Sequence, residues 1–145
     1  MITIKKNAFV FHSREKMFRL VDQVEDYPNF LPWCGEAEVI VHTKKITEAK
    51  ILINYHGVKQ SFTTRNVKIF PTKMSINLIK GPFKILKGEW RFIEIDKDTC
   101  KIVFELQYEF SNYVLDKLIS PVFNIIANTF IDNFIAKANK DNDAR

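Results

Sequence analysis

The amino-acid sequence predicts a single α+β domain in which a curved antiparallel sheet of seven strands wraps around one long C-terminal helix. Three observations predict this fold class. Seven segments carry the residue patterns of strands, with turn residues between several of them. The segment 113–138 instead repeats apolar residues every three or four positions, as an amphipathic helix does. The 145 residues contain no repeat or Gly/Ser linker, so one domain over 1–145 is expected.

The N-terminal part is expected to contain one strand and two short helices. Residues 2–12 have the apolar content of a strand. Ser13 is a favourable N-cap, and apolar residues at helical spacing follow it. Pro28 and Pro32 do not allow this helix to continue, so 25–35 is predicted to form a separate helical turn that Gly35 ends.

Six further segments show strand patterns, with apolar side chains at every second position and turns between them. They are 37–43, 48–56, 60–70, 74–78, 86–95 and 100–110. The last is the most regular, because six apolar residues occupy alternate positions from Cys100 to Phe110. Short connections make consecutive strands antiparallel, and each strand has one apolar face to bury.

The segment 113–138 is the long apolar element that remains to cover the concave face of the sheet. Pro121 lies within it, so we expect a kink there or a first segment that ends at Ser120. Residues 139–145 are polar and are expected to form a frayed tail. A helix is roughly 10 Å across, and a strongly curved sheet can enclose more than that. This helix-grip arrangement leaves space for a ligand beside the helix.

Composition restricts the class of protein. The chain is 46% hydrophobic and 27% charged, which is typical of a globular protein. No stretch approaches about 18 uncharged apolar residues, and the N-terminal residues turn polar before a signal peptide could form. The expected localisation is therefore cytoplasmic, with peripheral attachment to the inner membrane as an alternative. Cys34 and Cys100 are expected to be buried thiols. The sequence does not determine the oligomeric state.

Residue types that catalyse reactions or bind metals are not grouped in this sequence. His12, His42 and His56 lack metal-ligand spacing and are expected at the surface. Cys34 has no neighbouring base that would activate it as a nucleophile. Motifs for a catalytic serine, a phosphate loop or a dinucleotide site are not found in the sequence. We therefore expect no catalytic residues, no metal site, no required cofactor and a binding protein rather than an enzyme.

Aromatic residues are abundant, with 13 Phe, 4 Tyr and 2 Trp. Inward-facing rings can fill a solid core or line a cavity. We predict a cavity lined by Phe62, Met74, Ile76, Phe83, Trp90, Phe104, Leu106, Ile126 and Phe130. Its mouth is predicted to be formed by apolar residues of two loops, Tyr27, Phe30, Leu31, Trp33 and Phe83. The alternative is that these loop residues plug one end of the core.

Basic residues are concentrated in the middle of the chain. Between residues 41 and 91 there are eleven Lys or Arg against two acids, a net charge of +9 in a chain whose total is +5. Four of them occupy the polar faces of their strands, namely Lys50, Arg65, Lys87 and Arg91. Such a face could contact RNA phosphates or anionic lipid headgroups. A solubilising lysine-rich surface is the alternative.

Three segments together resemble one START-like family within the polyketide cyclase/dehydrase-like superfamily. They are VEDYPNFLPWC at 24–34, FTTRN at 62–66 and GPFKILKGEWRF at 81–92. That family has the helix-grip fold and includes coenzyme Q-binding proteins and bacterial ribosome-association toxins. The first group implies a bound ubiquinone or similar lipid in support of respiration. The second implies binding to the large ribosomal subunit, which blocks its joining to the small one. We expect the lipid-binding function, with the ribosome toxin as the alternative.

Overall fold

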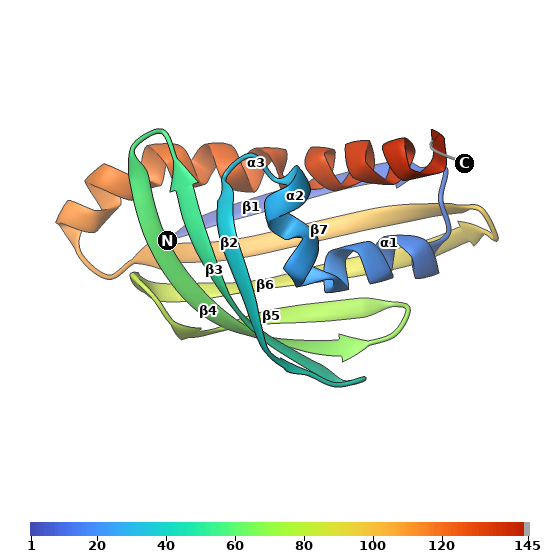
Figure 1. The fold of residues 1–145 in the computed structure, drawn as a ribbon, viewed down its shortest axis with the longest axis horizontal. Helices are drawn as coiled ribbons and strands as arrows, with labels where there is room; N and C mark the ends of the chain where they lie inside the picture. Colours follow the sequence, from blue (N-terminus) through green and yellow to red (C-terminus); the bar gives the residue numbers. More distant parts are fainter. Residues whose placement is uncertain (144–145) are drawn as a thin grey trace.

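The computed structural model describes residues 1–143, which form one antiparallel sheet and three α-helices (Figure 1). The chain begins with β1 (Ile2–Val10), α1 (Arg14–Asp22), the 3-10 turn η1 (Val24–Asp26) and α2 (Tyr27–Phe30). Six strands follow: β2 (Cys34–His42), β3 (Ile46–Tyr55), β4 (Val58–Ile69), β5 (Lys73–Lys80), β6 (Phe83–Asp96) and β7 (Thr99–Phe110). The last element is α3 (Tyr113–Asp143). This element order confirms the predicted fold class.

The seven strands are arranged in the order β1-β7-β6-β5-β4-β3-β2, and each neighbouring pair is antiparallel. Figure 1 shows the sheet curving around α3, with α1 and α2 on the same side as α3. In β7 every second side chain is buried from Cys100 to Phe110, as its alternating sequence predicts. The core lies between this inward face and the buried side of α3.

The helix α3 follows the first of the two alternatives predicted at Pro121, a kinked but continuous helix, and extends further than predicted at its C-terminal end. Asn112 caps it, since its side chain accepts a hydrogen bond from the backbone N–H of Leu115. The helix then continues through Pro121 instead of ending at Ser120, and its first turns slope relative to the rest in Figure 1. It also extends to Asp143, so residues 139–143 are helical rather than frayed. Residues 144 and 145 of the predicted tail lie outside the described residues.

All six strands after β1 begin earlier than predicted, and β2 and β6 do so by three residues, where loops were expected. Cys34 pairs with Ile53 at the start of β2, and a register shift follows before Glu36, so Gly35 belongs to the strand. The helical turn ends instead at Phe30, after which Leu31 is extended. Phe83 opens β6 by pairing with Phe110 of β7. Hydrogen-bonded pairing with a neighbouring strand decides where these strands begin, and such pairing cannot be predicted from the local sequence.

By length and mean hydropathy alone, α3 would qualify as a membrane span, with a value of 1.3 over its most apolar window. In this fold, however, one side of the helix packs in the core through residues such as Ile119, Ile126 and Phe134. The core helix of a domain passes the same composition test. Some of its apolar side chains lie on the outer side of the helix, where Leu118 and Ile125 are exposed.

Candidate ligand-binding cavity

A cavity of about 70 Å³ lies between the sheet and α3, and most of its lining is apolar. Seven of the nine residues predicted to line it do so, namely Phe62, Ile76, Trp90, Phe104, Leu106, Ile126 and Phe130. The other two, Met74 and Phe83, are buried in the core outside the lining. That these residues bind a ligand remains a prediction.

The sequence-based prediction missed part of the lining. The segment from α1 to α2 contributes Val21, Val24 and Tyr27. Further lining residues are Trp33, Ala49, Ile51, Thr64, Asn66, Leu86, Phe123 and Ala127. For the β4 residues the signal was present, since an inward Phe62 places positions 64 and 66 on the same face. Tyr27 and Trp33 were predicted at the cavity mouth, whereas only the tertiary fold brings Val21 and Val24 to the cavity.

The cavity is small for a lipid site. A cavity of roughly 150 Å³ is known to take up benzene, and the volume here is about 70 Å³. A ligand with a ring and a chain must therefore displace lining side chains. The prediction is therefore reduced to its weaker form, in which the cavity opens when the ligand enters, and that form stays a prediction.

Three of the five residues predicted at the cavity mouth, Tyr27, Phe30 and Trp33, form an aromatic cluster with α3. Tyr27 is buried and donates a hydrogen bond from its hydroxyl to the carbonyl of Val21. Burial, and then the nearby charge of Asp22, raise the pKa of Tyr27 well above its ordinary value. Phe30 packs edge-on against Phe134, with ring centroids 5.3 Å apart. This cluster joins α2 to α3 and covers one side of the cavity.

Leu31 and Phe83 are buried in the core and do not form an exposed rim at the cavity mouth. Leu31 is only 1% exposed. Phe83 is 6% exposed and stacks on Phe110 at 4.9 Å between centroids. Its ring also meets Phe62 and Phe123. These contacts favour the alternative reading, in which both residues plug an end of the core.

The inward face of β4 becomes polar along the strand. After Phe62 come Thr64, Asn66 and Lys68, which are 4%, 8% and 5% exposed. Thr64 and Asn66 line the cavity. Within residues 1–143 the Oδ1 atom of Asn66 has no hydrogen-bond partner, and neither has Nε1 of Trp33, which also lines the cavity. The cavity is thus apolar with a polar strip along one wall.

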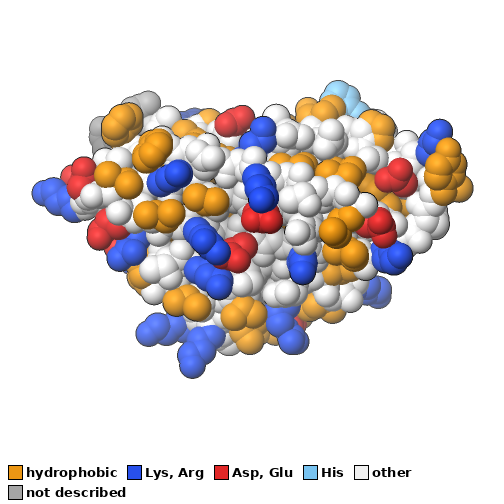
Figure 2. Space-filling view, turned by 180° about the vertical axis from the view of Figure 1, so that it is seen from behind, with side chains coloured by type: hydrophobic (Ala, Val, Ile, Leu, Met, Phe, Trp, Pro, Cys, Tyr) orange, Lys and Arg blue, Asp and Glu red, His pale blue; other side chains and the backbone are white. Residues whose placement is uncertain are grey.

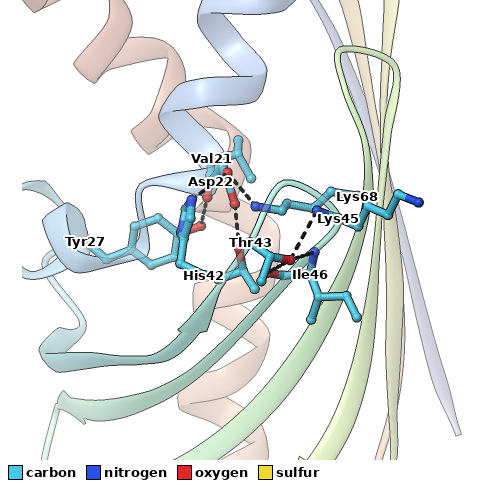
Figure 3. Close-up of polar contacts among 9 residues, drawn as sticks. Val21, Asp22, Tyr27, His42, Thr43, Lys45, Ile46 and Lys68 are labelled. Atoms are coloured by element: carbon cyan, nitrogen blue, oxygen red, sulfur yellow. Dashed lines mark hydrogen bonds and ion pairs between the residues drawn. The ribbon is translucent and has the colours of Figure 1, made fainter.

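Lys68 is not part of a basic surface, because it forms an ion pair inside the protein (Figure 3). Its Nζ donates to Oδ2 of Asp22 at 2.9 Å, and Thr47 donates its hydroxyl to Oδ1 at 2.9 Å. His42 lies 3.7 Å from the same carboxylate. The cluster ties the end of α1 to β2, β3 and β4.

The four predicted surface basics, Lys50, Arg65, Lys87 and Arg91, are all exposed. Two of them are already paired with acids: Arg65 with Glu48 and Arg91 with Glu89, each at 2.6 Å. Lys50 and Lys87 have no such ion pair within residues 1–143. Figure 2 shows basic, acidic and hydrophobic side chains mixed on the rear face.

Both thiols and one of the three histidines are buried. Cys34 and Cys100 are free and buried, as predicted, and burial raises the pKa of each thiol to about 11. His12 is 7% exposed rather than at the surface, because it bonds Asn139 at 2.7 Å. Across the described part of the chain, His, Cys, Asp and Glu form no group of three that could hold a metal ion.

The sequence matches the family model described as "Polyketide cyclase / dehydrase and lipid transport" over residues 10–135. It is 33% identical over 145 residues to the "Ribosome association toxin RatA" of Escherichia coli K12, covering all of this chain and 92% of that protein. It is 24% identical over 133 residues to the "Coenzyme Q-binding protein COQ10 homolog B, mitochondrial" of Xenopus laevis, covering 88% of this chain and 54% of that protein.

Solved structures share the fold at low identity. A START superfamily protein from Mycobacterium smegmatis has a TM-score of 0.80 at 13% identity, covering 95% of this chain and 97% of that one. The Zhui aromatase/cyclase from Streptomyces sp. R1128 has a TM-score of 0.79 at 12% identity, covering 96% and 94%. At such identities these similarities concern the fold alone.

Proposed function

Because this chain belongs to the polyketide cyclase/dehydrase and lipid transport family, we propose that it binds and carries a hydrophobic ligand without transforming it. The observation that carries this proposal is the apolar cavity between α3 and the sheet. A ubiquinone-type lipid in support of respiration is the proposed ligand, and similarity to a protein named for coenzyme Q binding supports it. Such a carrier would work in the cytoplasm and at the inner membrane.

Two features of the side chains support a role without catalysis. Both thiols are protonated at neutral pH, because burial raises the pKa of each to about 11. The hydroxyl of Tyr27, which lines the cavity, already donates to a backbone carbonyl. Neither group is therefore prepared to exchange protons with a ligand.

The test is direct detection of the ligand. Lipid extraction and mass spectrometry of the purified protein should identify a hydrophobic molecule, and the protein should move ubiquinone between vesicles. Ile126→Trp fills the cavity and should abolish transfer, because Ile126 lines it and is 4% exposed. Ile125→Trp is the matched control, since Ile125 is 48% exposed. Protein that purifies without lipid and takes none up would refute the carrier function.

A second candidate function is association with the large ribosomal subunit, which would block subunit joining. Its support is the 33% identity, over the full length of this chain, to a protein named ribosome association toxin. The exposed basic residues of the sheet offer contacts to ribosomal RNA phosphates. This function needs the outer surface rather than the cavity, so the two candidates can be separated by mutation.

The separating experiment reverses the charge of Lys50, Arg65, Lys87 and Arg91 to Glu. If the protein binds ribosomes, this variant should no longer co-sediment with large subunits, whereas ubiquinone uptake should hardly change. Reversal of Lys97, Lys117 and Lys140, which are exposed elsewhere, serves as the control. Wild-type protein that ignores ribosomes at low salt would exclude this second function.

A further inference from the structure

The polar strip on β4 is the feature that the apolar cavity does not explain. Asn66 is 8% exposed and lines the cavity, yet its Oδ1 atom has no hydrogen-bond partner among residues 1–143. Thr64, 4% exposed, lines the same wall two residues earlier. Buried polar side chains are nearly always hydrogen-bonded. An unpaired amide in this position therefore indicates a partner that enters the cavity.

We propose that Asn66 and Thr64 bind the polar head of the ligand, and that this head is uncharged and carries a hydroxyl or a carbonyl. The inference rests on the proposed ligand-binding function and adds the kind of head group that the site selects. The unpaired Oδ1 of Asn66 is an acceptor that matches a hydroxyl head, whereas the hydroxyl of Thr64 can also donate to a carbonyl head. The unpaired Nε1 of Trp33 offers a further donor from another part of the lining.

The charge balance next to this strip disfavours a charged head. Lys68 follows Asn66 on the inward face of β4, but its Nζ is engaged with Asp22 at 2.9 Å. The other oxygen of Asp22 accepts from Thr47. A carboxylate or phosphate head would thus enter the cavity without a free counter-ion, and burying an unpaired charge is strongly unfavourable. Fatty acids and phospholipids are therefore disfavoured relative to neutral lipids.

The remaining walls fit the hydrocarbon part of such a ligand. Trp90 and Phe104 lie on β6 and β7, with centroids 4.6 Å apart. Phe130 of α3 contacts both rings at 5.5 Å. Apart from the indole N–H of Trp90, these three side chains present only hydrocarbon, whereas Thr64 and Asn66 present oxygen acceptors. The ligand is therefore oriented with its head toward β4 and its chain toward the aromatic wall.

Three probes of equal chain length test this specificity: farnesol with a neutral hydroxyl, farnesene without a head, and farnesoic acid with a carboxylate. Both tryptophans of the chain line the cavity, so their fluorescence reports binding. Wild-type protein should bind farnesol about tenfold more tightly than either of the others, as one hydrogen bond allows. Asn66→Leu, which keeps the side-chain size, should lose this preference and still bind farnesene.

Asn77→Leu is the matched control, because Asn77 is exposed on the adjacent strand β5, and it should keep the preference for farnesol. Thr64→Val provides a second variant, expected to lose part of the preference, should Asn66→Leu fail to fold. If wild-type protein binds all three probes equally, or if neither variant changes the preference, the head-group inference is wrong and the carrier function stands. If wild-type protein binds none of the probes, both fail.

Discussion

Lys68 shows how a single residue changes role once its partners are known. In the sequence it is one of eleven basic residues between 41 and 91. In the fold its side chain is 2% exposed and faces the 15% exposed Asp22. Taking an ammonium group out of water is costly, and the Asp22 carboxylate with its additional bond to Thr47 offsets that cost. Removing one member of the pair should therefore lower the stability of the protein more than removing both.

Asp22→Asn should lower the free energy of unfolding by about 3–5 kcal/mol, because it leaves the buried Lys68 charge without its partner. Urea denaturation measures this. Glu48→Gln breaks the more exposed pair with Arg65 and should cost under about 1 kcal/mol. Adding Lys68→Met to Asp22→Asn should recover part of the loss. Equal costs for the two single variants would contradict the role given to the buried pair.

The two thiols make stability depend on alkaline pH. Burial raises the pKa of Cys34 and Cys100 to about 11, whereas an unfolded thiol titrates at roughly 8.5. Above that value the unfolded chain loses protons that the folded protein retains, so stability must fall as pH rises toward 11. Denaturation midpoints between pH 8 and 11 should show this fall, and Cys100→Ala should reduce it. A slope unchanged in that variant would show that Cys100 does not contribute.

At the scale of elements, the junction of β6, β7 and α3 closes one end of the core. Phe83 begins β6 directly after the Gly81–Pro82 connection, and Phe110 ends β7 opposite it. The backbone N–H of Ser111 donates to the carbonyl of Pro82 at 2.9 Å. Phe123 of α3 packs on the ring of Phe83 from above the sheet. The apolar loop noticed in the sequence is therefore a packed corner.

Phe83→Ala should destabilise the protein by about 3–5 kcal/mol, since it empties a buried aromatic site. The affinity of the folded variant for ubiquinone should change less than its stability, because Phe83 lies outside the cavity lining. Thermal unfolding and vesicle transfer measure the two effects. Phe11→Ala, at a residue 85% exposed, should alter neither. A larger loss of binding than of stability would restore Phe83 to the cavity mouth.

For the whole molecule, the two candidate functions use different surfaces and different forces. The cavity is mostly apolar, so ligand uptake should depend little on salt. The outer face presents Lys50 and Lys87 together with Arg65 and Arg91, and the two arginines are already paired with acids. Attraction to RNA phosphates through this face would depend strongly on salt.

Raising salt from 50 to 200 mM should weaken ribosome association roughly tenfold if only the two lysines engage phosphates, and roughly a hundredfold if all four residues do. Over the same range, ubiquinone uptake should stay nearly constant. Co-sedimentation and vesicle transfer at both salt concentrations give the comparison. Salt-independent co-sedimentation would argue that the basic face is not the contact surface.

The sequence by itself determined the elements and their order. Alternation in 100–110 and three-to-four spacing in 113–138 are local patterns, and each follows from the period of one strand or one helix. Seven of the nine residues that these periods predicted to line the cavity do so, because inward faces must meet α3. The resemblance of 24–34, 62–66 and 81–92 to one family pointed to the same fold.

Only the tertiary structure decided which distant residues pair on those faces, and how large the cavity between them is. Asp22 and Lys68 are 46 residues apart, and His12 bonds Asn139 across 127 residues, so no local pattern could pair them. The alternation of β4 places Thr64 and Asn66 on the same face as the inward Phe62, but polar residues on a strand are expected to face water, so their burial was not predicted. Cavity volume likewise depends on how closely distant side chains pack. Periodicity is a property of one segment, whereas pairing and volume arise only where several segments meet.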